Sequence, residues 1–113
     1  MKTNHEQLIL ASVEKIEESE KTLEKISFTC CMPIRSKRMQ DLFSELRNIS
    51  KLLKNLSEEA MPICVSKIEL CGSKIGKLYV SCCTEEREKL YQKLFKLLNE
   101  VHTNMYKLMG IAH

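Results

Sequence analysis

Apolar residues recur from Met39 to Ile63 at alternating intervals of three and four positions, without interruption. This spacing places them on one face of an α-helix, whereas a half-buried strand requires strict alternation of apolar and polar residues. The series consists of Met39, Leu42, Leu46, Ile49, Leu53, Leu56, Ala60 and Ile63. A continuous apolar face has to be covered in water, so we expect the chain to fold by packing helices against one another.

Three further series with the same spacing cover most of the remaining chain. The first contains Ile9, Val13, Ile16 and Leu23. The next is shifted by one position after Ile63 and contains Cys64, Ile68, Cys71, Ile75, Leu78 and Cys82. The last contains Leu90, Leu94, Leu97, Val101 and Leu108, and is widened by Tyr91, Leu98 and Met105. Only 3 Gly and 2 Pro occur in the 113 residues, so few positions interrupt these helices.

The breaks between the helices follow from these few residues. Pro33 ends the first helical region, and Pro62 lies at the one-position shift, where a new helix beginning between Ser57 and Pro62 would accept it in its first turn. Gly110 is a suitable C-terminal cap. We therefore predict a single all-α domain over residues 1–113, with helices at about 4–26, 36–58, 61–82 and 84–109. Similar lengths and short connections predict a compact up-down-up-down four-helix bundle.

Two alternatives remain open from the sequence. One unbroken helix over residues 36–82 would give an extended helical hairpin or coiled coil, with a helix of about 70 Å. In addition, the segment 72–83 contains two glycines and the run Leu78, Tyr79 and Val80, which also suits a strand.

Charge and hydropathy along the chain indicate how the helices are placed and where in the cell the protein lies. The segment 6–25 has six acidic and three basic residues, whereas the segment 35–54 has six basic and two acidic residues. Two neighbouring antiparallel helices of opposite charge explain this asymmetry. The chain shows no apolar run of a length that spans a membrane and no export signal near Met1, so we predict an intracellular protein of the cytoplasm or nucleus.

The 6 cysteines fall into two groups. Cys64 and Cys71 lie in a core series and are expected to pack as small apolar residues. The vicinal pairs are expected at one end of the bundle, where they could bind zinc or form a redox switch, although structural zinc sites usually separate their ligands by two to four residues. These low-priority candidates are Cys30, Cys31, Cys82 and Cys83. Acylation of Cys30 or Cys31 beside the basic residues that follow Pro33 is the one route to a membrane that the sequence offers.

Catalysis, cofactor binding and nucleic-acid binding find little support. The histidines, His5, His102 and His113, are expected at the end of the bundle opposite the cysteine pairs, which excludes a Cys-His dyad there. The sequence has no phosphate-binding loop, nucleophile elbow or dinucleotide fingerprint. The basic segment 35–54 contains Phe43 as its single aromatic residue, whereas single-strand binding relies on several stacking rings. The sequence therefore predicts a protein that is not an enzyme and has no cofactor.

More apolar residues are present than the four predicted core faces need. This surplus favours a non-enzymatic helical interaction module, a small subunit or adaptor of an intracellular complex, which binds helical segments of a partner or a second copy. A wider core would also explain the surplus. The interface candidates are Phe43, Leu52, Tyr79, Val80, Tyr91, Phe95 and Leu98. Gly72 and Gly76 could allow another helix to approach closely. The alternative function is the cysteine-centred zinc or redox protein.

Overall fold

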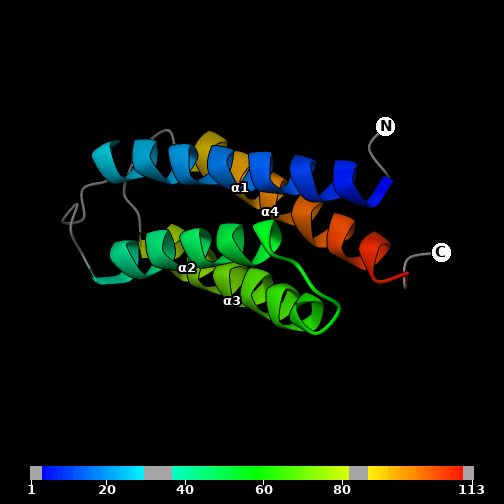
Figure 1. Ribbon diagram of the computed structural model, residues 1–113. Helices are drawn as coiled ribbons and strands as arrows, with labels where there is room; N and C mark the ends of the chain where they lie inside the picture. Colours follow the sequence, from blue (N-terminus) through cyan, green and yellow to red (C-terminus); the bar gives the residue numbers. More distant parts are fainter. Residues whose placement is uncertain (1–3, 30–36, 82–86, 111–113) are drawn as a thin grey trace.

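The computed structural model describes residues 4–29, 37–81 and 87–110, and they form four antiparallel helices (Figure 1). These are α1 (Asn4–Thr29), α2 (Lys37–Lys54), α3 (Ala60–Ser81) and α4 (Arg87–Leu108). Each helix packs against its neighbour in the chain, and α4 returns to pack against α1. Among the described helices, the backbones of α1 and α3 do not approach each other closely, because these helices occupy diagonally opposite corners of the bundle. The predicted all-α four-helix bundle is confirmed.

The core lies on the bundle axis and receives apolar side chains from all four helices. Five members of the longest sequence series, from Met39 to Leu53, are almost completely buried, as the spacing predicted. Burying one such side chain contributes about 1.5–3 kcal/mol relative to leaving it in water. Helix α2 is therefore stabilised mainly by packing its apolar face against the other helices, rather than by its own helix propensity.

The connection between α2 and α3 differs from the sequence prediction. Helix α2 ends at Lys54 rather than near residue 58. The side-chain oxygen of Ser57 accepts a hydrogen bond from the Ala60 N–H at 3.2 Å, and its carbonyl accepts from the Met61 N–H at 3.1 Å, so Ser57 caps α3. Pro62 lies in the first turn, where its missing N–H costs little. The single helix over 36–82 is therefore wrong.

Helix α3 continues to Ser81, so the strand alternative is wrong for residues 72–81, while residues 82 and 83 lie outside the described part of the chain. Helix α1 runs three residues beyond its predicted end, to Thr29. At the other end of the chain, α4 stops at Leu108 and Gly110 adopts a φ of 71°. The left-handed conformation of Gly110 confirms its predicted role as a C-terminal cap.

Small hydroxyl residues form the side of α1 that faces α4. Ser12, Ser19 and Thr22 are buried, and each hydroxyl donates to the backbone carbonyl four residues earlier, at 2.8, 2.8 and 2.9 Å. These local hydrogen bonds satisfy the donor of each hydroxyl within α1 itself. The four-and-three spacing of Ile16 and Leu23 predicts a core position at Glu20, which is half-buried, whereas the neighbouring Ser19 is completely buried.

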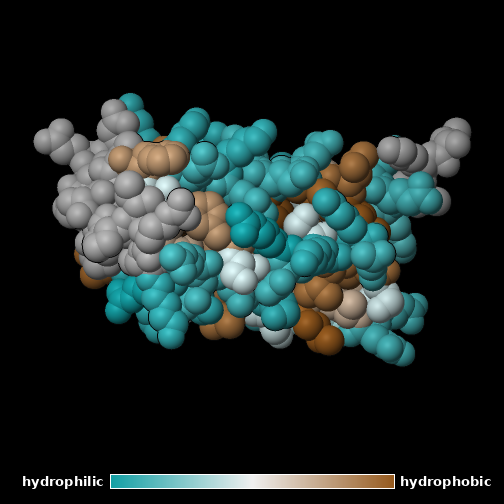
Figure 2. Space-filling view, turned by 60° about the vertical axis from the view of Figure 1, so that its left-hand side comes forward, coloured by the Kyte–Doolittle hydropathy of each residue, from teal (hydrophilic) through white to brown (hydrophobic). Residues whose placement is uncertain are grey.

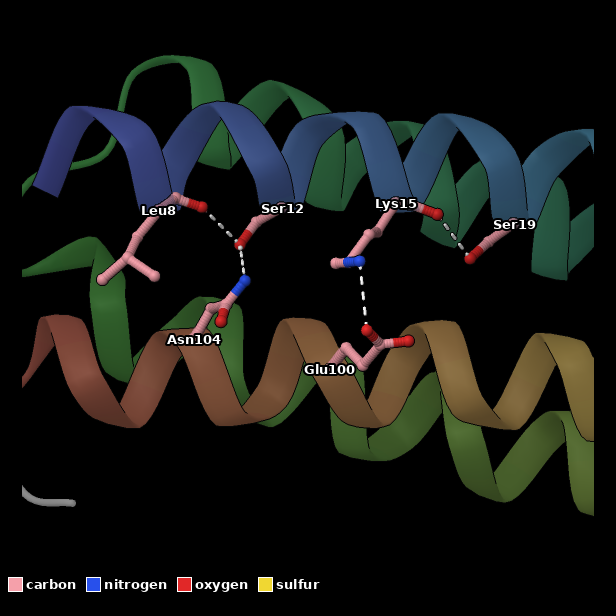
Figure 3. Close-up of polar contacts among 6 residues, drawn as sticks. All are labelled: Leu8, Ser12, Lys15, Ser19, Glu100 and Asn104. Atoms are coloured by element: carbon pink, nitrogen blue, oxygen red, sulfur yellow. Dashed lines mark hydrogen bonds and ion pairs between the residues drawn. The ribbon is translucent and has the colours of Figure 1, made fainter. Parts of the chain in front are cut away.

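Polar pairs across the α1–α4 contact flank these hydroxyls (Figure 3). The amide nitrogen of Asn104 donates to the Ser12 hydroxyl at 3.1 Å, and Lys15 lies 3.1 Å from Glu100. A second ion pair joins Lys93 to Glu18 at 2.7 Å. Both helices thus meet through small and polar residues beside the apolar core, and these partners fix their register.

Within the described bundle no helix packs closely against Gly72 or Gly76, so the approach of a partner helix there stays a prediction. A Cβ atom built on either glycine would meet nothing within 4 Å, apart from the glycine's own helix and chain neighbours. No other helix therefore needs the missing side chain at these positions. The close helix contact uses the serines of α1 instead.

Candidate interaction surface on helix α3

Helix α3 carries a second set of residues at alternating intervals of three and four, on the face that points away from the core. All six residues of this set are exposed. They are Ile63, Ser66, Leu70, Ser73, Lys77 and Val80, and we call them the outer seam of α3. The core-facing set, which includes Cys64, Ile68, Cys71, Ile75 and Leu78, is buried. Helix α3 therefore has two faces with the spacing of a helix–helix contact, and the fold uses one of them.

The apolar residues of the outer seam are strongly exposed. Ile63, Leu70 and Val80 have exposed fractions of 53%, 50% and 80%. The other exposed large hydrophobic residues in the described part of the chain are Leu10, Phe28 and Phe95. The side of the molecule drawn in Figure 2 is largely hydrophilic and shows hydrophobic residues in separate patches. The exposed large hydrophobic residues thus lie on α1, α3 and α4, and three of the six belong to the outer seam of α3.

Both borders of the outer seam carry charge. Lys67 and Lys74, one heptad apart, lie half-buried on the border towards α2, with Arg38 and Asp41 of α2 close to Lys74. On the opposite border, Glu69 lies 3.1 Å from Nε2 of His102 on α4. The lysine stems cover apolar surface while their ammonium groups reach solvent. The border towards α2 is therefore the more basic of the two.

Two of the predicted interface residues prove to be buried. Tyr91 is 1% exposed and Leu98 is 4% exposed, so both belong to the core. The buried face of α4 keeps Leu94, Val101 and Leu108 of the predicted series but takes Tyr91 and Leu98 in place of Leu90 and Leu97, which are half-buried. The prediction that Tyr91 and Leu98 form an interface is therefore wrong.

The other five interface candidates have different environments. Phe43, Leu52 and Tyr79 are half-buried and pack against the core cluster. The Tyr79 ring makes an edge contact with Tyr91 at a centroid distance of 5.2 Å, and its hydroxyl donates to Glu88. The two remaining candidates, Val80 and Phe95, are exposed, and they lie on different helices. Val80 is the only one of the seven in the outer seam of α3.

The sequence prediction missed Ile63 and Leu70. Ile63 was assigned to the core series of the preceding helix, because its spacing continues that series to the end. Leu70 belongs to no core series, but it lies one heptad after Ile63. A search for a second series within the same segment would have identified this face.

The described cysteines behave as core residues, as predicted. Cys64 and Cys71 are free thiols with no exposed surface. Burial raises the pKa of Cys64 to about 11. Burial also raises the pKa of Cys71 to about 12, where the Glu45 carboxylate adds to the rise and the Lys74 ammonium opposes it. Both thiols therefore remain protonated and inert near neutral pH.

The vicinal cysteines Cys30, Cys31, Cys82 and Cys83 lie outside the described residues, so the zinc or redox interpretation stays a prediction. Within the part of the chain that is described, no three His, Cys, Asp or Glu residues are grouped as a metal site. His102 contacts Glu69 and the ring of Tyr106, and His113 is outside the described residues. None of the described helices is long and apolar enough to span a membrane.

Comparisons with known proteins give no relatives. No protein-family model matches the chain. No curated protein and no solved structure matches it.

Proposed function

We propose that this protein is a non-enzymatic helical interaction module, a small subunit or adaptor of an intracellular complex. The outer seam of α3 is its docking surface, and the ligand is an amphipathic helix. The observation that supports this proposal is a second, exposed heptad series on a helix whose core-facing series is already buried. If α3 served only to cover the core, apolar residues at these exposed positions would add no stability to the fold.

The chemistry of the seam suggests how such a helix would bind. Ile63 and Leu70 are one heptad apart and can contact apolar residues at positions i and i+7 of the ligand. Ser66 and Ser73 alternate with them, and their small side chains allow the ligand backbone to come close. Lys67 and Lys74 favour a ligand with acidic residues on one border. The preferred ligand is thus an acidic amphipathic helix.

Site-specific photo-crosslinking in the native cell tests this proposal. A photoreactive residue at Ser66 lies within the outer seam, and one at Ser44 lies on the exposed face of α2 as the matched control. We expect a discrete crosslinked product from position 66 that is lost when Ile63 is also changed to Glu. Thermal melting followed by circular dichroism checks that Ile63→Glu leaves the fold intact. Identical products from positions 66 and 44 would contradict the proposal.

A further inference from the structure

We propose that the outer seam of α3 binds helix α1 of a second copy of this chain, in antiparallel orientation. This inference rests on the proposed function and names its ligand. It requires that α1 present an exposed face with matching spacing, carboxylates that can meet the lysines of α3, and an apolar residue at each end. Each of these requirements can be checked on the described residues.

Helix α1 has its own exposed series at alternating intervals of four and three. Its six residues all lie on the surface of the bundle. They are Leu10, Glu14, Glu17, Lys21, Glu24 and Phe28, and we call them the outer seam of α1. Leu10 is 44% exposed and Phe28 is 69% exposed. This seam is therefore an acidic strip with one apolar residue at each end.

The two seams have the same length. At a rise of about 1.5 Å per residue, Leu10 and Phe28 are about 27 Å apart along α1. By the same measure Ile63 and Val80 are about 26 Å apart along α3. The apolar ends of one seam can therefore meet the apolar ends of the other simultaneously.

An antiparallel alignment with Phe28 opposite Ile63 brings every residue of one seam opposite a residue of the other. Both ends of the contact are then apolar. The six layers are Leu10 with Val80, Glu14 with Lys77, Glu17 with Ser73, Lys21 with Leu70, Glu24 with Ser66, and Phe28 with Ile63. The two layers with serine leave room for the longer glutamate side chains.

Charge selects the antiparallel orientation. In this alignment Glu17 lies next to Lys74, and Glu24 lies next to Lys67, because each lysine follows a seam serine by one position. A parallel alignment with the same apolar ends would place Lys21 beside Lys74, which is a repulsive contact. The antiparallel orientation brings three glutamates of α1 close to lysines of α3 and avoids the contact between Lys21 and Lys74, so it supplies specificity.

The position of the two helices determines what kind of assembly results. Helices α1 and α3 occupy opposite corners of the bundle, so one copy can use both seams at once. The contact joins different faces of the two copies and is therefore heterologous. Such contacts extend into chains or close into rings of more than two copies, rather than stopping at a symmetric dimer.

Light scattering coupled to size-exclusion chromatography tests the assembly with the full chain. We expect the mass at low salt to exceed that of two chains at high concentration, and to fall to that of one chain on dilution or at about 1 M salt, where charges are screened beyond about 3 Å. Two blocked variants sharpen the test. Lys67→Glu with Lys74→Glu blocks the α3 seam, and Leu10→Glu with Phe28→Glu blocks the α1 seam.

Each blocked variant alone is expected to be a monomer. A mixture of the two should form a 1:1 dimer and nothing larger, because each variant supplies the seam that the other lacks. Lys51→Glu with Lys54→Glu on α2 is the matched control, with the same change of charge and unchanged assembly expected. A zero-length crosslinker should join Glu17 to Lys74 between copies, whereas a crosslink between Glu14 and Lys67 would indicate the parallel orientation and overturn the alignment.

The outcomes separate this inference from the proposed function. A chain that stays monomeric at all concentrations overturns the inference, and so does an assembly that survives both blocked variants. If photo-crosslinking at Ser66 then still gives a product that Ile63→Glu removes, the docking surface stands and its ligand is another protein. If that product is absent too, both proposals fail.

Discussion

Helices α2 and α3 lie side by side and face the core with similar series, yet their outer faces are different. The outer face of α2 is polar along its length and exposes residues such as Lys37, Ser44, Asn48 and Lys51. The outer face of α3 exposes Ile63, Leu70 and Val80 between serines and lysines. Because both helices are covered by the same bundle on one side only, packing cannot account for the difference. The apolar outer residues of α3 are surplus to the needs of the fold.

The largest expected effect compares a leucine of each helix. Leu46 of α2 has no exposed surface, so Leu46→Ala should lower the free energy of unfolding by about 2–5 kcal/mol through lost burial and a cavity. Leu70 of α3 is half exposed, and in dilute solution Leu70→Ala should change stability by no more than about 0.5 kcal/mol. Urea unfolding followed by circular dichroism measures both. Equal losses would show that the outer seam of α3 supports the fold.

The core-facing set of α3 contains cysteines, whereas the core series of α2 does not. The buried thiols make the stability of the folded chain depend on pH. The pKa of Cys71 is raised to about 12 in the folded chain, from an ordinary value of 9.0. The folded state therefore holds this proton more tightly than the unfolded state does. The corresponding stability is complete below about pH 9 and is lost as the pH rises towards 12.

Urea unfolding between pH 8 and about pH 11 should show this loss, and Cys71→Ala should flatten the dependence while lowering stability at pH 8. Lysines titrate in the same range, so the difference between the two proteins is the informative quantity. A thiol reagent at neutral pH should likewise react with Cys71 only as fast as the chain opens. Equal pH profiles for the two proteins would contradict the raised pKa of Cys71.

Replacing a glycine with alanine should change the free energy of unfolding by about 1 kcal/mol. The sign should differ between the glycines inside α3 and the glycine that caps α4. Gly72→Ala and Gly76→Ala should each stabilise the chain by about 0.8–1 kcal/mol, because alanine favours helix and its Cβ meets nothing within 4 Å. Gly110→Ala is the matched control and should destabilise by about 1–2 kcal/mol, because its φ of 71° disfavours a side chain. Thermal melting of the three variants measures the difference in sign.

Sequence periodicity was sufficient for the fold but not for the functional face. The core series of α2 was predicted residue by residue because an uninterrupted apolar series has one way to be buried. The boundary near Lys54 was missed because the spacing continues through Ile63, while the cap at Ser57 depends on hydrogen bonds that spacing does not contain. Periodicity identifies a helical face without saying whether another helix covers it.

Periodicity also failed to identify all the buried residues of α4 and α1. On α4 the apolar stripe is wide, so two neighbouring registers fit the sequence, and packing selects the one with Tyr91 and Leu98 inside. On α1 the buried positions at Ser12 and Ser19 are polar, and their hydroxyls are satisfied by the helix's own carbonyls. A search for apolar residues passes over such positions. Which outer face remains uncovered is a property of the assembled bundle.

The smallest expected effect is the most direct test of whether the two outer faces differ in folding at all. Asn48 of α2 and Ser73 of α3 are both exposed within a helix. Replacing either with Ala should stabilise the dilute chain by about 0.5 kcal/mol, because both residues favour helix less than alanine does. Urea unfolding at low protein concentration, where copies do not meet, is the appropriate measurement.

If both substitutions stabilise equally, the outer faces of α2 and α3 are equivalent for the isolated bundle, and their difference can act only between molecules. A loss of more than about 1 kcal/mol for Ser73→Ala alone would instead give that serine a role within its own chain. In that case the spacing of the outer seam would reflect the fold rather than a ligand. We therefore expect the outer faces of α2 and α3 to contribute equally to the stability of the monomer and to differ strongly in their contribution to association.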